Sequence, residues 1–269
     1  MSPARFLSAR RRHRSAGLVV LLFGLLAVGS AYAAFAPDDA VADNSAQSQQ
    51  IEEGKKLFSV GCSSCHGLNA EGGGNGAGKM AGPSLIGVGA AAVDFQVGTG
   101  RMPAAASGPQ VEQKPVQFTD AQIAALATYV ASLGPGPAIP DSAYLQGNGD
   151  VSAGAELFRV NCAMCHNVAG AGGALTEGKY APSLSGVTAK HIYEAMVTGP
   201  QNMPVFNDLN ITPADKANII SYLKYLDKHP SPGGLDLGNL GPVSEGLFVW
   251  IFALGSVVAI TVWLTAKSN

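Results

Sequence analysis

The sequence predicts an all-α chain with two tandem helical domains, a C-terminal transmembrane helix and a hydrophobic N-terminal segment. Three observations lead to this prediction: a sequence block that occurs twice, a charge-free stretch near the C-terminus, and an arginine cluster followed by an apolar run. Charged residues make up 13% of the 269 residues, about half the usual share of about 25%. We therefore expect the chain to meet a membrane or to enclose an apolar cofactor.

Residues 1–37 have the pattern of an export signal. Several arginines precede an apolar run that ends at Ala36 and passes through Ala31-Tyr32-Ala33, which is an acceptable cleavage pattern. The run is also long enough to span a bilayer as a helix. The segment is predicted to be either a cleaved signal peptide or a retained membrane anchor, and both would export the residues that follow.

Residues 247–265 are uncharged and place Trp250 and Trp263 near their two ends, which predicts a transmembrane helix with aromatic interface anchors. Lys267 follows, so the positive-inside rule puts the C-terminus in the cytoplasm and the body outside the cell membrane. That body, residues 38–245, has eleven basic and nineteen acidic residues, a net charge of −8. A nucleic-acid partner is excluded because phosphate binding needs a basic face.

The body contains two copies of one sequence repeat. GKKLFSVGCSSCH at residues 54–66 matches GAELFRVNCAMCH at residues 154–166. Further on, a terminal helix pattern at residues 118–133 matches one at residues 211–226, with candidate N-cap threonines at their starts. The first copy carries a longer insertion at residues 104–117.

The repeat predicts a first domain over residues 51–133 and a second over residues 151–228. Residues 134–150 are predicted to be a stiff Pro/Gly linker. Residues 231–246 are a second linker that leads to the membrane helix. Each domain is expected to have helices at its ends and Gly-rich loops between them.

Both copies contain the motif C-x-x-C-H, which is the attachment pattern of covalent haem. On a short helix, two cysteines three residues apart face one side and can bond both haem vinyl groups, and the histidine then faces the iron. Disulfides, a thioredoxin-like centre and a zinc site are the alternatives, but a helical segment precedes each motif and none explains the repeated histidine. The predicted attachment residues are Cys62, Cys65, Cys162 and Cys165, with His66 and His166 as iron ligands.

A haem iron used for electron transfer commonly takes methionine as its second axial ligand. Met102 and Met203 coincide in the repeat and each precedes a proline, so we predict that they are these ligands. Met196 is expected to be a core residue. Met80 is expected to be a loop residue rather than an iron ligand.

Other residues are given supporting roles. Pro83 and Pro182 follow the histidines at similar spacing, and a backbone carbonyl there is expected to accept the imidazole N–H. Arg101 is a candidate partner of a haem propionate, although Asn202 replaces it in the second copy. Close helix crossings are predicted at Gly54 and Gly154, aromatic contacts at Phe58–Tyr129 and Phe158–Tyr222, and surface positions at His191 and His229.

In each of the two copies, these motifs together resemble the class I cytochrome c fold. With both hydrophobic ends, the chain resembles the dihaem cytochrome c subunit of the actinobacterial menaquinol–cytochrome c reductase, the cytochrome bcc complex. The resemblance implies two covalent haems c, partnership with a cytochrome b subunit and a Rieske iron–sulfur subunit, and electron delivery to a haem–copper cytochrome c oxidase. It also implies that the second domain receives electrons and the first passes them on.

Three other functions compete with this interpretation. A dihaem subunit of another terminal oxidase usually has only an N-terminal anchor, which the apolar segment at residues 247–265 argues against. A dihaem peroxidase needs an open iron, whereas two methionines predict closed irons and no substrate chemistry on this chain. A free dihaem shuttle is disfavoured by the C-terminal anchor.

Overall fold

The structure is a computed structural model that describes residues 15–35, 38–73, 82–106, 108–229 and 242–266. These residues are mostly helical, which confirms the all-α prediction, and their strands are two residues long. Residues 50–269 form one compact unit, and residues 1–49 form another.

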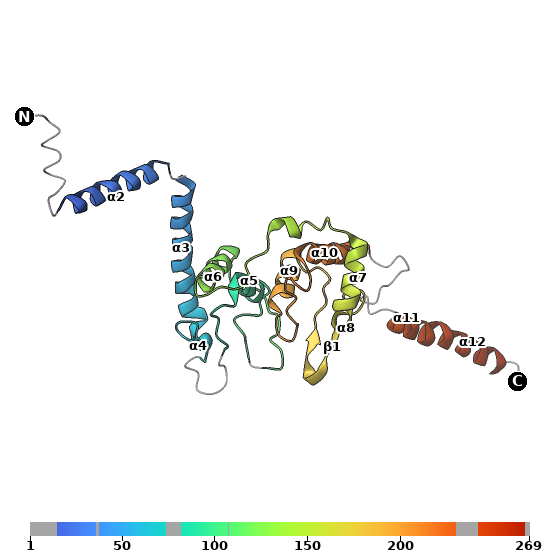
Figure 1. The fold of residues 1–269 in the computed structure, drawn as a ribbon. Coiled ribbons are helices and arrows are strands. Elements are labelled where there is room, and N and C mark those ends of the chain that lie inside the picture. Colours follow the sequence, from blue (N-terminus) through green and yellow to red (C-terminus); the bar gives the residue numbers. More distant parts are fainter. Residues whose placement is uncertain (1–14, 36–37, 74–81, 107, 230–241, 267–269) are drawn as a thin grey trace, which may run out of the picture. The chain divides into compact units, whose positions relative to one another are not determined.

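The elements of the two repeated domains follow the same order (Figure 1). In the first domain they are α3 (Asp38–Gly61), α4 (Ser63–His66), α5 (Gly89–Gly98) and α6 (Asp120–Ser132). In the second they are α7 (Val151–Asn161), α8 (Ala163–His166), β1 (Gly173–Ala174), η2 (Thr176–Gly178), β2 (Tyr180–Ala181), α9 (Ala189–Thr198) and α10 (Pro213–Lys228). The domain boundaries 51–133 and 151–228 stay predictions from the repeat.

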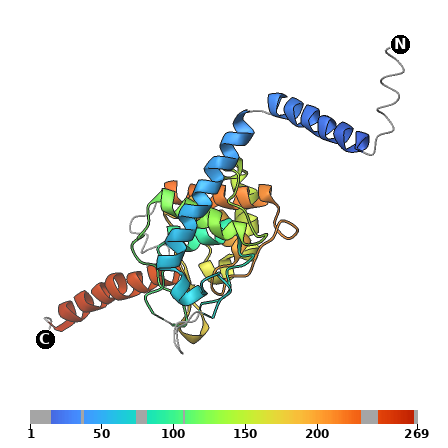
Figure 2. The ribbon, with the colours of Figure 1, turned by 90° about the vertical axis from the view of Figure 1, so that its left-hand side faces the viewer.

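In each domain the first and last helices cross at a glycine. A Cβ atom at Gly54 would overlap the carbonyl oxygen of Ala125 on α6, and one at Gly154 would overlap that of Asn218 on α10. Figure 1 shows α10 crossing α7, and Figure 2 shows α3 passing in front of the helices of the first domain. These positions therefore require a residue without a side chain.

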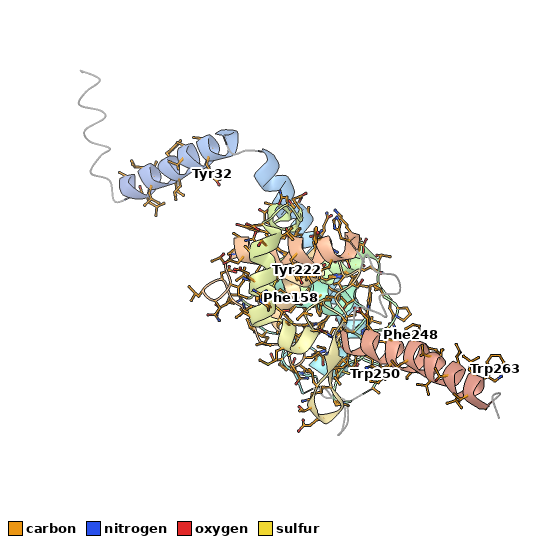
Figure 3. All side chains as sticks on the ribbon, turned by 90° about the vertical axis from the view of Figure 1, so that its right-hand side faces the viewer. Tyr32, Phe158, Tyr222, Phe248, Trp250 and Trp263 are labelled. Carbon is orange, nitrogen blue, oxygen red and sulfur yellow. The ribbon has the colours of Figure 1, made fainter. Side chains whose placement is uncertain are left out.

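The predicted aromatic contacts lie next to these crossings. The rings of Phe58 and Tyr129 are 5.3 Å apart, and those of Phe158 and Tyr222 are 5.5 Å apart (Figure 3). Both phenylalanines are fully buried. Each pair joins the start of its domain to the end, which the sequence places far apart.

The last helices begin as predicted. The Thr119 side chain accepts a hydrogen bond from the backbone N–H of Gln122, whose own side chain accepts from the Thr119 N–H, a full capping box. Thr212 accepts from the N–H of Asp215 in the same way. These caps satisfy N–H groups that a helix start leaves without partners.

The linker between the domains contains a short 3-10 helix, η1 (Ser142–Leu145), which the Pro/Gly composition did not predict. Its Tyr144 lies 6.1 Å, ring to ring, from Tyr193 of α9. The second linker, residues 231–246, falls largely outside the described residues.

The apolar end of the chain is helical through α11 (Pro242–Phe248), the π-helical turn η4 (Val249–Leu254) and α12 (Gly255–Ala266). Over Ser244–Ala266 it is long and apolar enough to cross a membrane, and none of its central residues is buried. Trp250 and Trp263 lie on this helix (Figure 3).

At the other end, α2 (Ala16–Phe35) is an apolar and largely exposed helix. Whether it is cleaved or retained stays a prediction.

The two repeated domains contact each other. Helix α5 of the first packs against α9 of the second. The insertion of the first copy also reaches across: the N–H of Tyr180 donates to Gln110 Oε1 at 2.9 Å, and the N–H of Val111 donates to Gln201 Oε1 at 3.2 Å. The inserted segment is thus part of the contact between the domains.

Candidate haem sites

Each C-x-x-C-H motif forms a single helical turn after a longer helix. The N–H groups of Cys65 and His66 donate to the Cys62 carbonyl at 3.2 and 3.0 Å. The second motif repeats this, with distances of 3.1 and 2.9 Å to the carbonyl of Cys162. The four cysteines form no disulfide with one another.

The first cysteine of each motif is unsuited to thiolate chemistry. Burial, helped by the neighbouring cysteine, raises the pKa of Cys62 and of Cys162 to about 11. A thioredoxin-like nucleophile needs a lowered thiol pKa. The surroundings of these two cysteines therefore disfavour a thioredoxin-like centre.

The Nδ1 atom of each motif histidine lies within hydrogen-bond distance of a backbone carbonyl oxygen. His66 Nδ1 lies 2.8 Å from the Pro83 oxygen, and His166 Nδ1 lies 2.9 Å from the Pro182 oxygen. Since a carbonyl only accepts, each Nδ1 carries the proton and each Nε2 keeps a lone pair for a metal. Gly82 keeps this contact close, because a Cβ atom there would overlap the His66 ring.

The second domain contains a cavity of about 580 Å³, within the usual range of about 300–1,000 Å³ for cofactor sites. Its walls bring together Cys162, Cys165, His166 and Met203, with apolar side chains around them. Met196 is buried, as expected of a core residue, and also lines the cavity. A cysteine pair, an imidazole and a thioether around one apolar cavity fit a covalent haem.

This cavity is not closed by the second domain alone. Its lining includes residues of the first domain, among them Phe95, Gly98, Arg101 and Gln110. The candidate haem cavity of the second domain therefore lies at the contact between the domains.

In the first domain, Met102 packs against the buried cluster that contains Phe58. The Lys114 ammonium group donates to three carbonyl oxygens beside it: those of Gly100 at 3.2 Å, Arg101 at 3.4 Å, and Pro103. Lys114 belongs to the insertion, so the second copy has no counterpart. Met80 lies outside the described residues.

A buried charged cluster lies where α5 meets α9. Asp94 Oδ2 is 2.7 Å from Lys190 Nζ and 3.8 Å from His191 Nε2. Glu194 is fully buried, and among the described residues neither of its carboxylate oxygens accepts a hydrogen bond. Burial and the nearby Asp94 raise the pKa of Glu194 to about 9, so it is protonated at neutral pH.

The prediction for His191 was wrong. Its side chain is 16% exposed and its ring meets Phe95 edge-on, with centroids 6.0 Å apart. The reason is that the first domain covers the face of α9 that would be surface in an isolated domain. His229 is exposed, as expected.

The repeat does not reveal this cluster, because its residues differ between the two copies. Asp94 stands opposite Tyr193, and Glu194 opposite Phe95, in the alignment of the two copies. One signal was present: Asp94 is the single charge in the apolar helix Gly89–Gly98. A lone carboxylate in such a helix indicates a partner from elsewhere.

Comparison with known proteins gives two family matches. The family described as "Cytochrome c" matches residues 51–134, and "Cytochrome C oxidase, cbb3-type, subunit III" matches residues 149–223. Each match covers one copy of the repeat.

Full-length relatives are also found. The cytochrome bc1 complex cytochrome c subunit of Corynebacterium efficiens is 43% identical, over 99% of this chain and 95% of its own length. That of Corynebacterium diphtheriae is 42% identical over the full length of both chains, and that of Mycobacterium tuberculosis is 44% identical over 96% of this chain and 93% of its own. The chain, with two cytochrome c domains and a C-x-x-C-H motif for a covalent haem c in each, therefore belongs to the family of cytochrome c subunits of the cytochrome bc1 complex.

Proposed function

We propose that this chain is the dihaem electron-transfer subunit of a menaquinol–cytochrome c reductase, and that it passes electrons from a Rieske iron–sulfur centre to a haem–copper oxidase. The observation that best supports this is the second haem cavity, which opens onto the first domain. Two sites packed together in one unit suit transfer through the chain.

Each haem would carry one electron at a time. Its two axial side chains would leave no open coordination position on the iron for a substrate. His66 and Met102 would hold the first iron, and His166 and Met203 the second. A methionine thioether favours the ferrous state and raises the potential. No substrate would bind, so quinol oxidation would take place on a cytochrome b partner.

Pro83 and Pro182 would act through the histidines. Their carbonyl oxygens accept hydrogen bonds from the Nδ1–H groups, with N···O distances of 2.8 and 2.9 Å, and so fix the orientation of each ring. A fixed ring needs little rearrangement when the iron changes charge, which keeps transfer fast.

The order of the haems and the side of the membrane also belong to the proposal. The helix Ser244–Ala266 would anchor the second domain beside the reductase core, with both domains on the extracytoplasmic side. Lys267 after the helix supports this orientation. Electrons would enter at the second domain and leave from the first.

The partners can be tested by gentle solubilisation of the tagged chain and a reduced-minus-oxidised spectrum. Bands of haem b and haem a beside the c band are expected. A c band with b alone would support the reductase and contradict the oxidase link through haem a, and a c band alone would contradict both partners.

The order can be tested with a quinol reductant and two variants of the complex. Met203→His lowers the potential of the second haem, and should therefore leave the first haem oxidised for longer. Met102→His, which changes the downstream haem, should leave the second haem to be reduced as fast as in the parent protein. The reverse pattern would contradict the proposed direction.

A further inference from the structure

Arg101 belongs to the first domain, but its side chain lines the haem cavity of the second. The next residue, Met102, packs instead against the core of the first domain. Two consecutive residues thus face the cavity of one domain and the core of the other. Burial lowers the pKa of Arg101, and Tyr180 of the second domain opposes that shift.

Among the described residues, the guanidinium group of Arg101 has no acidic partner in an ion pair. The residue is 9% exposed. Its Cζ atom lies 5.0 Å from the centroid of the Phe95 ring, a cation–π contact. A cation–π contact compensates only part of the cost of removing a charge from water.

The acidic groups nearby do not provide such a partner. Asp94 is paired with Lys190 at 2.7 Å, and Glu194 is protonated at neutral pH. A buried cation that faces an apolar cavity requires an anion from the group that fills the cavity. A haem carries two such anions, its propionate carboxylates.

We infer that Arg101 binds a propionate of the haem attached to Cys162 and Cys165, so that the first domain holds part of the second domain's cofactor. Arginine suits this role because its planar, forked donors match both oxygens of a carboxylate. The inference rests on the two haem sites of the proposed function.

The repeat alone does not indicate this assignment. Asn202, at the position matching Arg101, also lines the cavity of its own domain. The haem of the second domain thus has an arginine from its neighbour where its own copy of the motif supplies only an amide. The pairing would link cofactor binding in the second domain to the contact between domains.

The test is redox potentiometry on the purified full-length holoprotein. Arg101→Gln leaves the carboxylate charge uncompensated, which favours ferric iron and lowers the potential of the second haem. We expect the electron to redistribute between the two haems by about tenfold or more, equivalent to about 59 mV for a one-electron couple. The first haem should keep its potential.

Two further variants identify the haem and the cause. In a Met203→His background, which marks the second haem by its lowered potential, the shift must follow the marked haem. Arg159→Gln, which removes an exposed arginine of the second domain, should change neither potential. Arg101→Lys keeps the positive charge but loses the planar, forked donors of the guanidinium group, so we expect a smaller fall in the potential of the second haem. This variant also tests the inference if Arg101→Gln does not accumulate.

The outcomes separate the inference from the proposed function. A shift confined to the first haem, or unchanged potentials with a loss of stability, would overturn the role of Arg101 while both haems remain in place. A parent protein without two methionine-ligated haems would instead overturn the proposed function.

Discussion

Glu194 makes the stability of this protein depend on pH in a direction opposite to that of most carboxylates. Its pKa is raised from an ordinary value of 4.5 to about 9, because it is buried at the domain contact with Asp94 nearby. Lys190 and His191 of the same helix and Arg101 of the facing domain also surround this contact. The folded state keeps the proton, whereas the unfolded chain releases it near the ordinary value.

The sign follows from the proton count. Between pH 4.5 and 9 the folded state binds one more proton than the unfolded state, so stability falls as pH rises. The slope is about 1.4 kcal/mol per pH unit at most. From pH 6.5 to 8.5 this amounts to about 2.7 kcal/mol, or a Tm lower by about 5–11 °C for a domain pair of this size.

The assay is thermal unfolding of the solubilised holoprotein between pH 6.5 and 8.5, followed by circular dichroism. Glu194→Gln mimics the protonated acid and should remove this part of the slope. Glu177→Gln, at an exposed position, is the matched control and should keep it. If Tm falls with pH equally steeply in the parent and in Glu194→Gln, Glu194 is not the source of the pH dependence.

Three other predictions concern the haem sites. Cys162→Ser should prevent the second domain from accumulating in folded form, because a domain of this size has a small core and the haem would supply apolar volume to it; haem staining and protein yield check this, and a normal yield of folded apoprotein would contradict it. Met203→Ala should open the second iron, so that carbon monoxide binding and peroxidase activity appear where the parent shows neither; an unreactive variant would argue for a different ligand. Lys114→Met should weaken the methionine-to-iron charge-transfer band of the first haem through loss of three carbonyl contacts, with recovery in Lys114→Arg; an unchanged band would mean that Lys114 does not position Met102.

The internal architecture of each domain was predictable from the sequence because it is repeated. Gly54 and Gly154 recur at the helix crossings, and Thr119 and Thr212 recur at the helix starts. Such features depend on contacts within one copy, so both copies preserve them.

The contact between the domains was not predictable in the same way. Asp94, Lys190 and Glu194 occur at positions where the copies differ, and a repeat cannot indicate how its copies pack. The expected surface position of His191 failed for this reason. The insertion at residues 104–117 was visible as a length difference, but its contacts with the second domain required the structure.

The packing of α5 against α9 has a kinetic consequence. A diffusing carrier delivers electrons in a second-order step, whose rate depends on the concentrations of both partners. Between two domains held in contact on one chain, transfer is first-order, so its rate constant in each chain does not depend on how many copies the membrane holds. Under proposed respiratory turnover, throughput would then scale with the number of assembled complexes rather than with the supply of a mobile pool.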